Sequence, residues 1–543
     1  MYTLLALFLF CVAVSLNSAA EFSFASYYGD HMVLQKAPER AVLWGYGANG
    51  SKVIVSLEGE QGSRAEQAVY VQNGVWRATL DPVKAGGPYN VTAVQQGAGK
   101  AQVTLTDVLF GDVWLCGGQS NMAYTLSQVI NESAEAALAS KYPQVRIFMA
   151  ALETSREPLM DLPRVEVPWS VPTAELLAGP AFTHFSAVCW LFGRYLYKTL
   201  GYPVGLVSSC WGGTPVEAWS STRALQKCGL EKQEKLDISF MKLPGTLPVP
   251  PESLSRLMNA WKNSVLWNAM IHPLLSMTIK GAIWYQGESN TGYHLYKYSC
   301  SFPTMIDDWR EAFHTGSGGQ TALDFPFGFV QISTSVKSSK SYAFPILRWQ
   351  QSARYGYAPN PRMKNTFMAV ALDLPDERSP WGSIHPRDKQ DVAYRLTLGA
   401  RAVAYGEKGV AFQGPFPAKV LLDGDSLNVT YTQAVSVTNS SSVFEVCCTQ
   451  EKKPCNSSST WLPAPTVQWG RSYVQLSVSG CKGRGVGPAL RVEGLALRLQ
   501  SLPGLQRRPG AAGPALHREP LDASGRAGRL VRRVLRMFIN ETK

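Results

Sequence analysis

A chain of 543 residues is longer than one average domain, so we expect two or three. Its 45% hydrophobic and 11% aromatic content supports sizeable cores and excludes an intrinsically disordered protein. Residues 482–543 hold 13 Lys and Arg against 4 Asp and Glu, which is +9 of the total net charge of +12. The other 481 residues therefore carry only +3, too small an excess to predict a nucleic-acid partner.

The first twenty residues are typical of a secretory signal peptide. Residues 4–14 are almost wholly apolar, a run too short to cross a bilayer, and the small residues Ser18, Ala19 and Ala20 follow. An uncleaved N-terminal anchor is the alternative interpretation. We predict cleavage near Ala20, entry into the secretory pathway to a lysosomal or extracellular location, and no membrane span in the mature chain.

Seven Asn-x-Ser/Thr sequons fit the secretory route, because such sites accept N-glycans there. They are Asn49, Asn90, Asn131, Asn428, Asn439, Asn456 and Asn540.

Nine cysteines remain once Cys11 is removed with the signal, so some are expected to pair and at least one to stay unpaired. Four of them lie late in the chain and are expected to brace one domain. They are Cys447, Cys448, Cys455 and Cys481. A zinc site is the alternative, but no paired C-x-x-C spacing supports it.

Residues 21–108 are predicted to form a small β-sandwich. The segments VLWGYG, SKVIVSLEG, GVWRATL and YNVTAV are short, rich in β-branched and aromatic residues, and separated by Gly and Asn.

Residues 109–405 alternate between strand and helix patterns. Strands are predicted at 112–116, 144–150, 204–210, 280–286, 325–333 and 366–372, and helices at 120–141, 187–201 and 385–406. Continuous apolar strands separated by helices predict a parallel sheet covered on both faces. A polar, proline-rich stretch near 223–262 is predicted to be a surface excursion from this sheet.

β patterns return over 406–481, which predicts a second β module. The last segment, 482–543, contains no aromatic residue between Tyr473 and Phe538 and is rich in Arg, Gly, Pro and Ala. Such a composition favours a flexible tail. A basic tail that binds a partner is one interpretation. We favour a non-native sequence from an alternative exon or shifted reading frame, which predicts poor folding or inactivity.

Sites in open parallel sheets form at the carboxyl ends of the strands, so we inspected the loops that follow them. Ser120 lies in such a loop, within GGQSN. The start of a following helix favours negative charge, and the glycines allow a substrate to approach closely. The same position suits a simple helix N-cap, which position alone favours over a nucleophile. The loop is not a G-x-S-x-G elbow.

Two further loops carry hydrogen-bond donors. Gly212 and Gly213 follow the strand at 204–210, and their N–H groups could bind an oxyanion, although turns also contain such pairs. The loop after 280–286 contains the polar side chains of Gln286, Glu288, Ser289 and Asn290. Ser289 there is the competing serine, also followed by Asn.

His385 is the candidate base for a hydrolytic serine. It is one of seven histidines and lies in a loop after the strand at 366–372, where the other candidate loops also emerge. A solvated loop histidine is the plainer interpretation. No Walker loop, dinucleotide fingerprint or H-E-x-x-H motif occurs, so no metal or nucleotide cofactor is indicated.

These loops resemble the motifs of the sialate O-acetylesterases, within the SGNH-type hydrolases. GDVWLCGGQSNM is similar to that family's nucleophile block, and CWGGT, WYQGESN and IHP to its later blocks, in the same order. DHMVLQ, WNAMIHPL and LRWQQ resemble further motifs, so the resemblance covers about residues 21–480. It implies an α/β fold, a three-layer α/β/α sandwich with a parallel sheet and added N- and C-terminal β modules.

The resemblance also implies the roles of individual residues. Ser120 is the nucleophile and His385 its base. The oxyanion is held by the N–H groups of Ser120 and Gly213 and by an amide of Gln286 or Asn290.

A histidine-orienting Asp is often placed shortly before the histidine in such enzymes, but positions 382 and 383 are Gly and Ser. Asp388, Asp376 and Glu288 are the alternatives, or a backbone carbonyl. Arg348 or Arg378 could bind a substrate carboxylate.

The activity implied is removal of O-acetyl groups from sialic acids, chiefly at the 9 position, from free or glycan-linked substrate through an acetyl-enzyme. One alternative is an acetyl esterase for other acetylated carbohydrates. Another is a catalytically degenerate carbohydrate-binding glycoprotein, which the missing Asp would favour.

Overall fold

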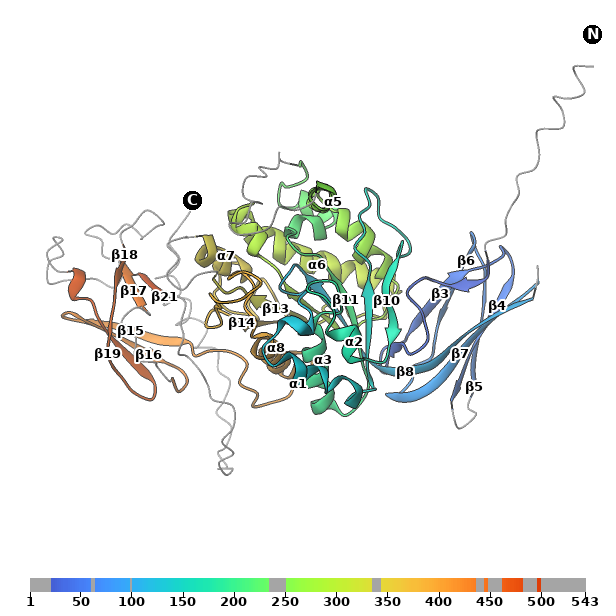
Figure 1. The fold of residues 1–543 in the computed structure, drawn as a ribbon, viewed down its shortest axis with the longest axis horizontal. Coiled ribbons are helices and arrows are strands. Elements are labelled where there is room, and N and C mark those ends of the chain that lie inside the picture. The colour runs from blue at the N-terminus through green and yellow to red at the C-terminus, as the bar shows by residue number, and fades with distance from the viewer. Residues whose placement is uncertain are drawn as a thin grey trace, which may run out of the picture.

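The computed structural model describes residues 21–59, 64–97, 100–233, 251–334, 343–435, 444–447, 461–481 and 496–499. The predicted signal peptide, the sequons at Asn439, Asn456 and Asn540, and the predicted tail apart from 496–499 lie outside these ranges. An N-terminal β region, a central α/β region and a C-terminal β region follow one another along the long axis (Figure 1).

The N-terminal region contains two sheets. One has the order β1-β3-β6, from β1 (Ser23–Phe24), β3 (Val42–Tyr46) and β6 (Val75–Thr79). The other joins β5 (Arg64–Tyr70), β4 (Lys52–Gly59), β7 (Gly86–Gln96) and the first half of β8 (Ala101–Gly118), with β2 (Val33–Gln35) beside β8. Alternate residues of β4 are buried, so the two sheets share a core.

Strand β8 connects this region to the central sheet. Its second half has β11 and β12 as parallel neighbours in the order β10-β9-β11-β8-β12-β13-β14. The bounds are β9 (Val145–Ala150), β10 (Val165–Ser170), β11 (Val204–Cys210), β12 (Gly281–Tyr285), β13 (Phe327–Gln331) and β14 (Thr366–Val370). Only β10, at the edge, is antiparallel. Because β8 crosses the predicted boundary at residue 108, no linker separates the two regions.

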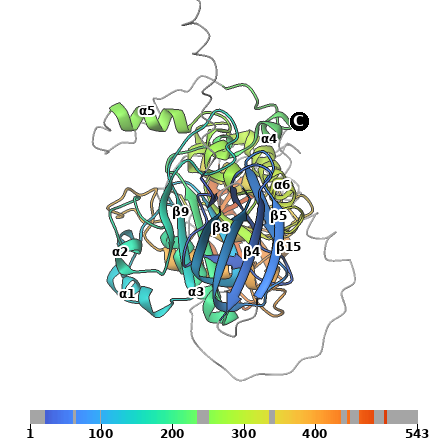
Figure 2. The same ribbon diagram turned by 90° about the vertical axis from the view of Figure 1, so that its right-hand side faces the viewer.

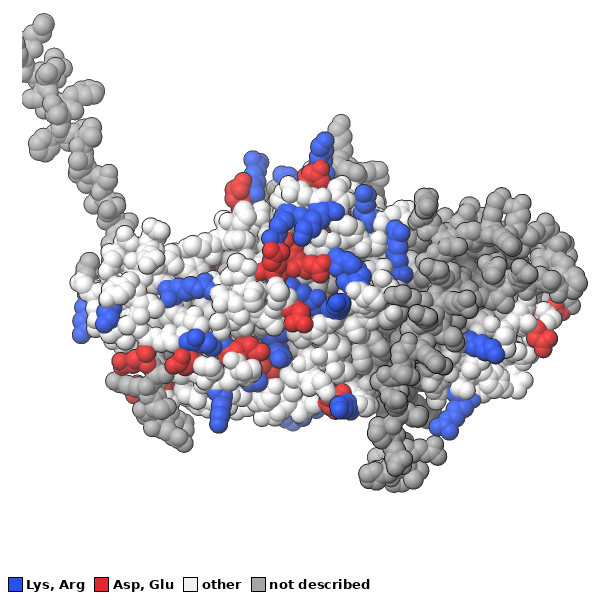
Figure 3. Space-filling model, turned by 180° about the vertical axis from the view of Figure 1, so that it is seen from behind, with Lys and Arg blue, Asp and Glu red and all other residues white. Residues whose placement is uncertain are grey.

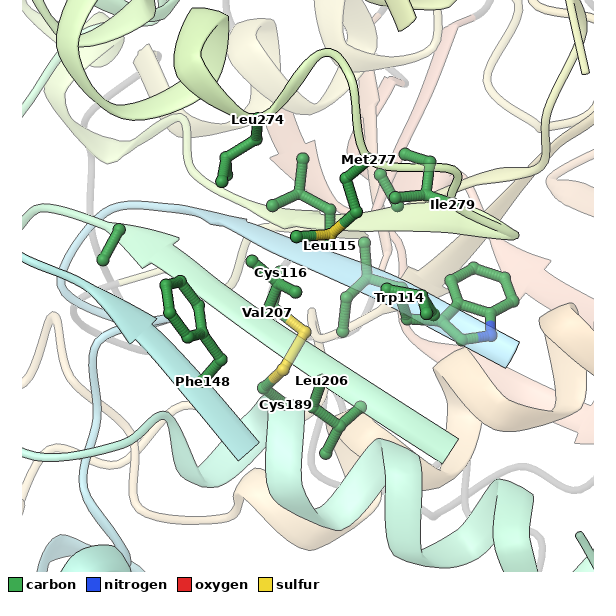
Figure 4. Close-up of a cluster of buried hydrophobic side chains, with 14 of the residues drawn as sticks. Trp114, Leu115, Cys116, Phe148, Cys189, Leu206, Val207, Leu274, Met277 and Ile279 are labelled. Carbon is green, nitrogen blue, oxygen red and sulfur yellow. A yellow bond between two sulfur atoms is a disulfide. The ribbon is translucent and has the colours of Figure 1, made fainter. Parts of the chain in front are cut away.

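Helices cover both faces of the central sheet, as predicted. On one face lie α3 (Ala187–Leu200) and α8 (Lys389–Val403), where Trp114 of β8 meets Phe192 with 5.1 Å between ring centroids. On the other face, Trp284 of β12 meets Trp309 of α6 (Tyr298–Gly316) at 5.7 Å. A disulfide between Cys116 and Cys189 fastens β8 to α3 (Figure 4).

Shorter helices fill the connections between these elements. The α-helices are α1 (Glu132–Ala136), α2 (Ala174–Leu177), α4 (Thr222–Gln226), α5 (Pro251–Ala260) and α7 (Ala343–Gln351). Single turns occur at η1 (Leu126–Gln128), η2 (Ala139–Lys141), η3 (Val216–Trp219), η5 (Trp267–Ile271), η6 (His272–Leu274), η7 (Glu288–Thr291), η8 (Leu295–Lys297) and η9 (Ser479–Cys481). Helix α5 projects from the central region within the predicted excursion (Figure 2).

The predicted helix over 120–141 is wrong. Only the single turns η1 and η2 and the five-residue α1 form there, and no helix begins at Ser120. Thr125 is extended at the start of η1, and Asn131 has a left-handed φ of +58°, so the chain turns twice within the segment. Ser120 is therefore not a helix N-cap. The predicted helix at 385–406 begins four residues later, at Lys389, which leaves His385 in the preceding loop.

The C-terminal region has its own core. One sheet has the order β15-β16-β20-β19, from β15 (Pro417–Asp423), β16 (Ser426–Tyr431), β20 (Tyr473–Ser477) and β19 (Thr466–Trp469). A second joins β18 (Trp461–Pro463), β17 (Phe444–Cys447) and β21 (Ala496–Leu499), the last from within the predicted tail. Buried residues such as Leu427, Val446 and Leu476 pack into a cluster distinct from the central core.

Most of the described cysteines are paired, and most of the described sequons are exposed. A second disulfide joins Cys228 to Cys300, Cys481 is also disulfide-bonded, and Cys210 is a buried free thiol. Among the sequons in the described ranges, Asn49, Asn90 and Asn131 are exposed and Asn428 is half-buried. No helix in the described part of the chain is long and apolar enough to cross a membrane. On the face seen in Figure 3, acidic and basic side chains are interspersed.

Candidate active site

A tight glycine turn presents Ser120 at the carboxyl end of β8. Gly118, the last residue of the strand, has a φ of +139°, and a Cβ there would lie 2.2 Å from the Tyr285 carbonyl oxygen. Only glycine fits this position. The Gln119 N–H donates to the same carbonyl at 3.0 Å, so the serine loop is held against the end of β12.

His385 lies directly beside Ser120 although 265 residues separate them. The Ser120 hydroxyl contacts His385 Nε2 at 2.8 Å, and His385 Nδ1 contacts the Trp381 carbonyl oxygen at 2.7 Å. Because a carbonyl can only accept, Nδ1 carries the proton and donates it to Trp381. Nε2 is then the lone-pair nitrogen, and the serine O–H donates to it. The imidazole is thus in the tautomer that a general base needs.

Aromatic rings and hydrogen bonds hold the histidine loop. The His385 carbonyl accepts the Tyr124 hydroxyl at 2.8 Å and the Ser379 hydroxyl at 2.6 Å. The Phe182 ring lies 5.2 Å from the imidazole, centroid to centroid. Burial in this environment lowers the pKa of His385 to about 4, and the nearby Lys389 charge acts in the same direction. The imidazole therefore stays neutral well into the acidic range.

The carboxylates that the sequence offered as orienting groups have other partners. Asp388 caps helix α8 by accepting a backbone N–H of its first turn. Asp376 forms an ion pair with Arg387 at 2.6 Å, and Glu288 accepts the Asn121 amide at 2.6 Å. The backbone-carbonyl alternative matches the geometry, since the Trp381 oxygen is the group that contacts Nδ1.

Two backbone N–H groups next to Ser120 are available to an oxyanion. Those of Ser120 itself and of Gly213 have no acceptor among the described residues. The loops that carry them are close together, since a Cβ on Gly212 would lie 3.3 Å from the Ser120 Cβ. Unpaired N–H groups close to a nucleophilic serine are the kind of donor that can stabilise the negative oxygen of a tetrahedral intermediate.

The side-chain amides of Gln286 and Asn290 are already occupied. The Gln286 amide donates to the Thr214 carbonyl at 3.2 Å and to Asn290 Oδ1 at 2.7 Å. The Asn290 amide donates to Glu217 at 2.9 Å and to the Tyr293 carbonyl at 3.1 Å. Each amide has two N–H bonds, so neither has one left for an oxyanion in this structure. They instead brace the loop that carries Gly213.

Gln119 offers an amide that the sequence gave no reason to select. Its Oε1 accepts the N–H groups of Gly287 and Ser289 at 3.4 and 3.3 Å. Its Nε2 has no acceptor among the described residues and adjoins the nucleophile loop. Gln119 is thus a candidate third donor, and its position next to Ser120 is the only signal that could have indicated it.

Ser289 lacks the environment of Ser120. It lies in the single turn η7, with its backbone N–H bonded to Gln119, and no histidine in the described ranges contacts its hydroxyl. His294, the nearest histidine in sequence, contacts Glu217 at 3.0 Å. The two Ser-Asn pairs follow turns of the same kind, because Gly118 has a φ of +139° and Gly287 a φ of +142°. They do not share a base.

Two arginines lie near the loops of the site. Arg348 is on α7 and only 7% exposed. Arg256 on α5 is exposed, with its guanidinium 5.3 Å from the centroid of the Trp211 ring and a hydrogen bond to the Leu152 carbonyl at 2.6 Å. Arg256 therefore lies beside the loop that carries Gly213. In the described ranges, no three His, Cys, Asp or Glu side chains come together as a metal site would need.

Two family models match the chain. The carbohydrate esterase family of sialic acid-specific acetylesterases matches residues 110–381, and the sialate O-acetylesterase C-terminal domain matches residues 418–491.

Known proteins align over most of the length. The mouse sialate O-acetylesterase is 49% identical over 488 residues, which are 87% of this chain and 89% of the mouse protein. The human sialate O-acetylesterase is 48% identical over 470 residues, 85% of this chain and 86% of the human protein. The crystal structure of a carbohydrate acetylesterase from Xanthomonas citri superposes with a TM-score of 0.65 at 27% identity, covering 84% of this chain and 90% of that one.

Replacing Asp388 tests which group orients His385. Asp388→Ser keeps a capping oxygen for α8, so we expect kcat with an aryl acetate to stay within about threefold of wild type. Loss of a true orienting carboxylate lowers kcat by about 10⁴-fold in a serine hydrolase. A decrease of that size in Asp388→Ser would identify Asp388 as the orienting group. Asp388→Ala, without a cap, should lower only the free energy of unfolding, by about 1 kcal/mol.

The pH dependence of kcat/KM should reflect the lowered pKa of the partly buried imidazole. Only neutral His385 can accept the serine proton, and its pKa is lowered to about 4. Activity on an aryl acetate should therefore persist as the pH falls from 7 to about 5 and decline as it passes through about 4. Circular dichroism at each pH would confirm that the protein is folded. An acid limb near the ordinary histidine value of about 6.5 would contradict the burial argument.

Proposed function

Since the chain belongs to the sialate O-acetylesterase family, we propose that it removes O-acetyl groups from sialic acids, chiefly at the 9 position, with Ser120 as nucleophile and His385 as general base. The observation that carries the residue assignment is the 2.8 Å contact between Ser120 Oγ and His385 Nε2. The neutral tautomer set by the Trp381 carbonyl supports it.

In the first half-reaction, Ser120 Oγ bonds to the acetyl carbonyl carbon while its proton moves to His385 Nε2. The carbonyl oxygen becomes negative and accepts the N–H groups of Ser120 and Gly213. When the tetrahedral intermediate collapses, the bond to the sugar oxygen breaks and His385 returns the proton to that oxygen. The deacetylated sialic acid leaves, and Ser120 carries the acetyl group.

In the second half-reaction, water attacks the acetyl carbon and gives its proton to His385 Nε2. The same N–H groups hold the oxyanion. Collapse then breaks the bond to Ser120 Oγ, which recovers the proton, and acetate is released. In both steps the Trp381 carbonyl faces an imidazolium whose Nδ1–H it accepts, so the ring keeps its orientation throughout.

A sialic acid also presents a carboxylate, which an arginine would recognise. We propose Arg348 for this role from its motif, and Arg256 as an alternative from its exposure beside Trp211. Arg348 is largely buried, which leaves little of its side chain open to a substrate.

We further propose that the protein works in the secretory pathway, in lysosomes or after secretion. The exposed sequons Asn49, Asn90 and Asn131 and the two disulfides support this location. A base that remains neutral to about pH 4 also suits an acidic compartment.

A second candidate is an acetyl esterase for other acetylated carbohydrates. The similarity to the carbohydrate acetylesterase of Xanthomonas citri favours it, since the same serine and histidine would serve either substrate. A non-catalytic binding protein is the third outcome that an assay can reveal.

Acetate release from 9-O-acetyl sialic acid distinguishes these functions and the two serines. Ser120→Ala should lose at least about 10³-fold in kcat, while Ser289→Ala should keep most activity because no histidine of the described ranges contacts that serine. Equal release by wild type and Ser120→Ala would remove Ser120 from the mechanism. Turnover of acetylated xylan without turnover of the sialate would favour the second candidate, and no release from either would favour a binding protein.

The arginine assignments are tested by comparing a charged and an uncharged ester. Losing a hydrogen bond to a carboxylate should raise KM for the acetylated sialate about 10-fold or more, with an aryl acetate unaffected. We expect this in Arg348→Ala or in Arg256→Ala. Turnover of the aryl acetate also reports that each variant is folded. Unchanged kinetics with both esters would reject the arginine in question.

A further inference from the structure

Lys389 is a fully buried lysine beside the candidate site that the proposed mechanism does not use. It is the first residue of α8, where the helix dipole disfavours a cation, and its side chain is 0% exposed. Its Nζ donates to Asn121 Oδ1 at 2.6 Å and lies 4.5 and 5.0 Å from the ring centroids of Tyr124 and Tyr285. Burying an ammonium in this way is unfavourable unless its interactions compensate, so its position calls for an explanation.

Asn121, the acceptor of Lys389, joins the three loops of the site. It directly follows Ser120. Its Nδ2 donates to Glu288 Oε1 at 2.6 Å, in the loop after β12, and to the Ile384 carbonyl at 3.0 Å, next to His385. One amide therefore connects the nucleophile loop, the histidine loop and the loop of the second Ser-Asn pair.

The two charges fix the direction in which this amide faces. Protonated Lys389 can only donate and so requires Oδ1, while ionised Glu288 can only accept and so requires Nδ2. A flipped amide would place donor against donor and acceptor against acceptor. The second N–H of Asn121 is consequently aimed at the Ile384 carbonyl, and hydrogen bonds in such a chain strengthen one another in a buried environment.

We propose that Lys389 is a positioning residue, whose charge acts through Asn121 to hold the His385 loop against Ser120 and keeps the imidazole in its neutral, proton-accepting form. The proposal rests on the proposed roles of Ser120 and His385. The hydrogen bond and ring contacts of Lys389 are with Asn121, Tyr124 and Tyr285, so its effect on Ser120 and His385 is indirect.

The second part of the proposal follows from like-charge repulsion. Burial lowers the pKa of Lys389 to about 7, so the ammonium is charged where His385 titrates. A positive charge nearby disfavours an imidazolium and lowers the pKa of His385 further, after burial as the larger cause. Removing the charge should therefore raise the pKa of His385. The other ionisable groups around the pair are Glu288, Asp376, Arg387, Asp388, Tyr124 and Tyr285.

Lys389→Met retains the length of the side chain and removes its charge. We expect kcat/KM for an aryl acetate to fall about 10²-fold, the scale of loss for a displaced catalytic group. We also expect the acid limb to move up by about one pH unit. Lys389→Arg keeps the charge and should leave the limb near its wild-type position. Wild-type kcat/KM and an unmoved limb in Lys389→Met would overturn the proposal.

Lys36→Met is the matched control. Lys36 is also mostly buried, lies 3.7 Å from the buried Asp112 and faces an aromatic ring at 5.0 Å, but it lies near the middle of β8, six residues or more before the turn at Gly118. Lys36→Met should leave both kcat/KM and the acid limb unchanged. An equal change in this variant would reduce the Lys389 effect to general destabilisation and overturn the proposal.

Two further arms keep the test decisive. Should Lys389→Met not fold, the double variant Lys389→Met, Glu288→Gln removes both buried charges and should still show the raised acid limb. The pKa of His385 can also be read by NMR with ¹³C-labelled histidine, assigned with His385→Ala. An increase there supports the proposal and no change overturns it, even in a protein that turns over the aryl acetate but not the sialate. Turnover of the aryl acetate without turnover of the sialate would count against the proposed substrate alone.

Discussion

The hydrogen bond between Ser120 and His385 is the interaction on which the site depends. It spans 2.8 Å in space and 265 residues in sequence. Strands β8 and β14 run parallel in one sheet, so the Ser120 loop after β8 and the His385 loop after β14 begin at the same carboxyl end of the sheet. Yet β12 and β13 lie between them, which separates the strands by about 14 Å. The loop before α8 must reach back across that distance, and the hydrogen bonds from Tyr124 and Asn121 hold it there.

Backbone groups and side-chain amides differ in this site in whether they are already hydrogen-bonded. Around the Ser120 and His385 side chains, the main chain offers the N–H groups of Ser120 and Gly213, which have no acceptor among the described residues, and the Trp381 carbonyl that contacts His385 Nδ1. The side-chain amides of Gln286 and Asn290 have both of their N–H groups hydrogen-bonded and support the loop that carries Gly213. Buried polar networks with every group satisfied make a structure rigid. A rigid support is what an oxyanion site needs, because its donors must be in place before charge develops.

Much of this arrangement could be predicted from sequence, since continuous apolar strands and glycine turns are local signals. The predicted helix over 120–141 failed because its Ala- and Glu-rich composition suits a helix, while Thr125 and Asn131 break the chain into short turns. The role of the Trp381 carbonyl could not be predicted from the sequence, since every residue has a backbone carbonyl. Lys389 could not be selected either, because the helix predicted from residue 385 did not place it at the helix start, where a lysine opposes the dipole. Its hydrogen-bond partner, the side-chain amide of Asn121, is 268 residues away in the sequence and is identified only by the structure.

The central claim, that Ser120 is the serine activated by His385, is tested most directly by covalent labelling. A fluorophosphonate forms a stable bond only with an activated serine, and peptide mass spectrometry locates the label. The account predicts one label, on Ser120, which His385→Ala abolishes and Ser289→Ala leaves intact. A label on Ser289, or none on a protein that releases acetate, would contradict it.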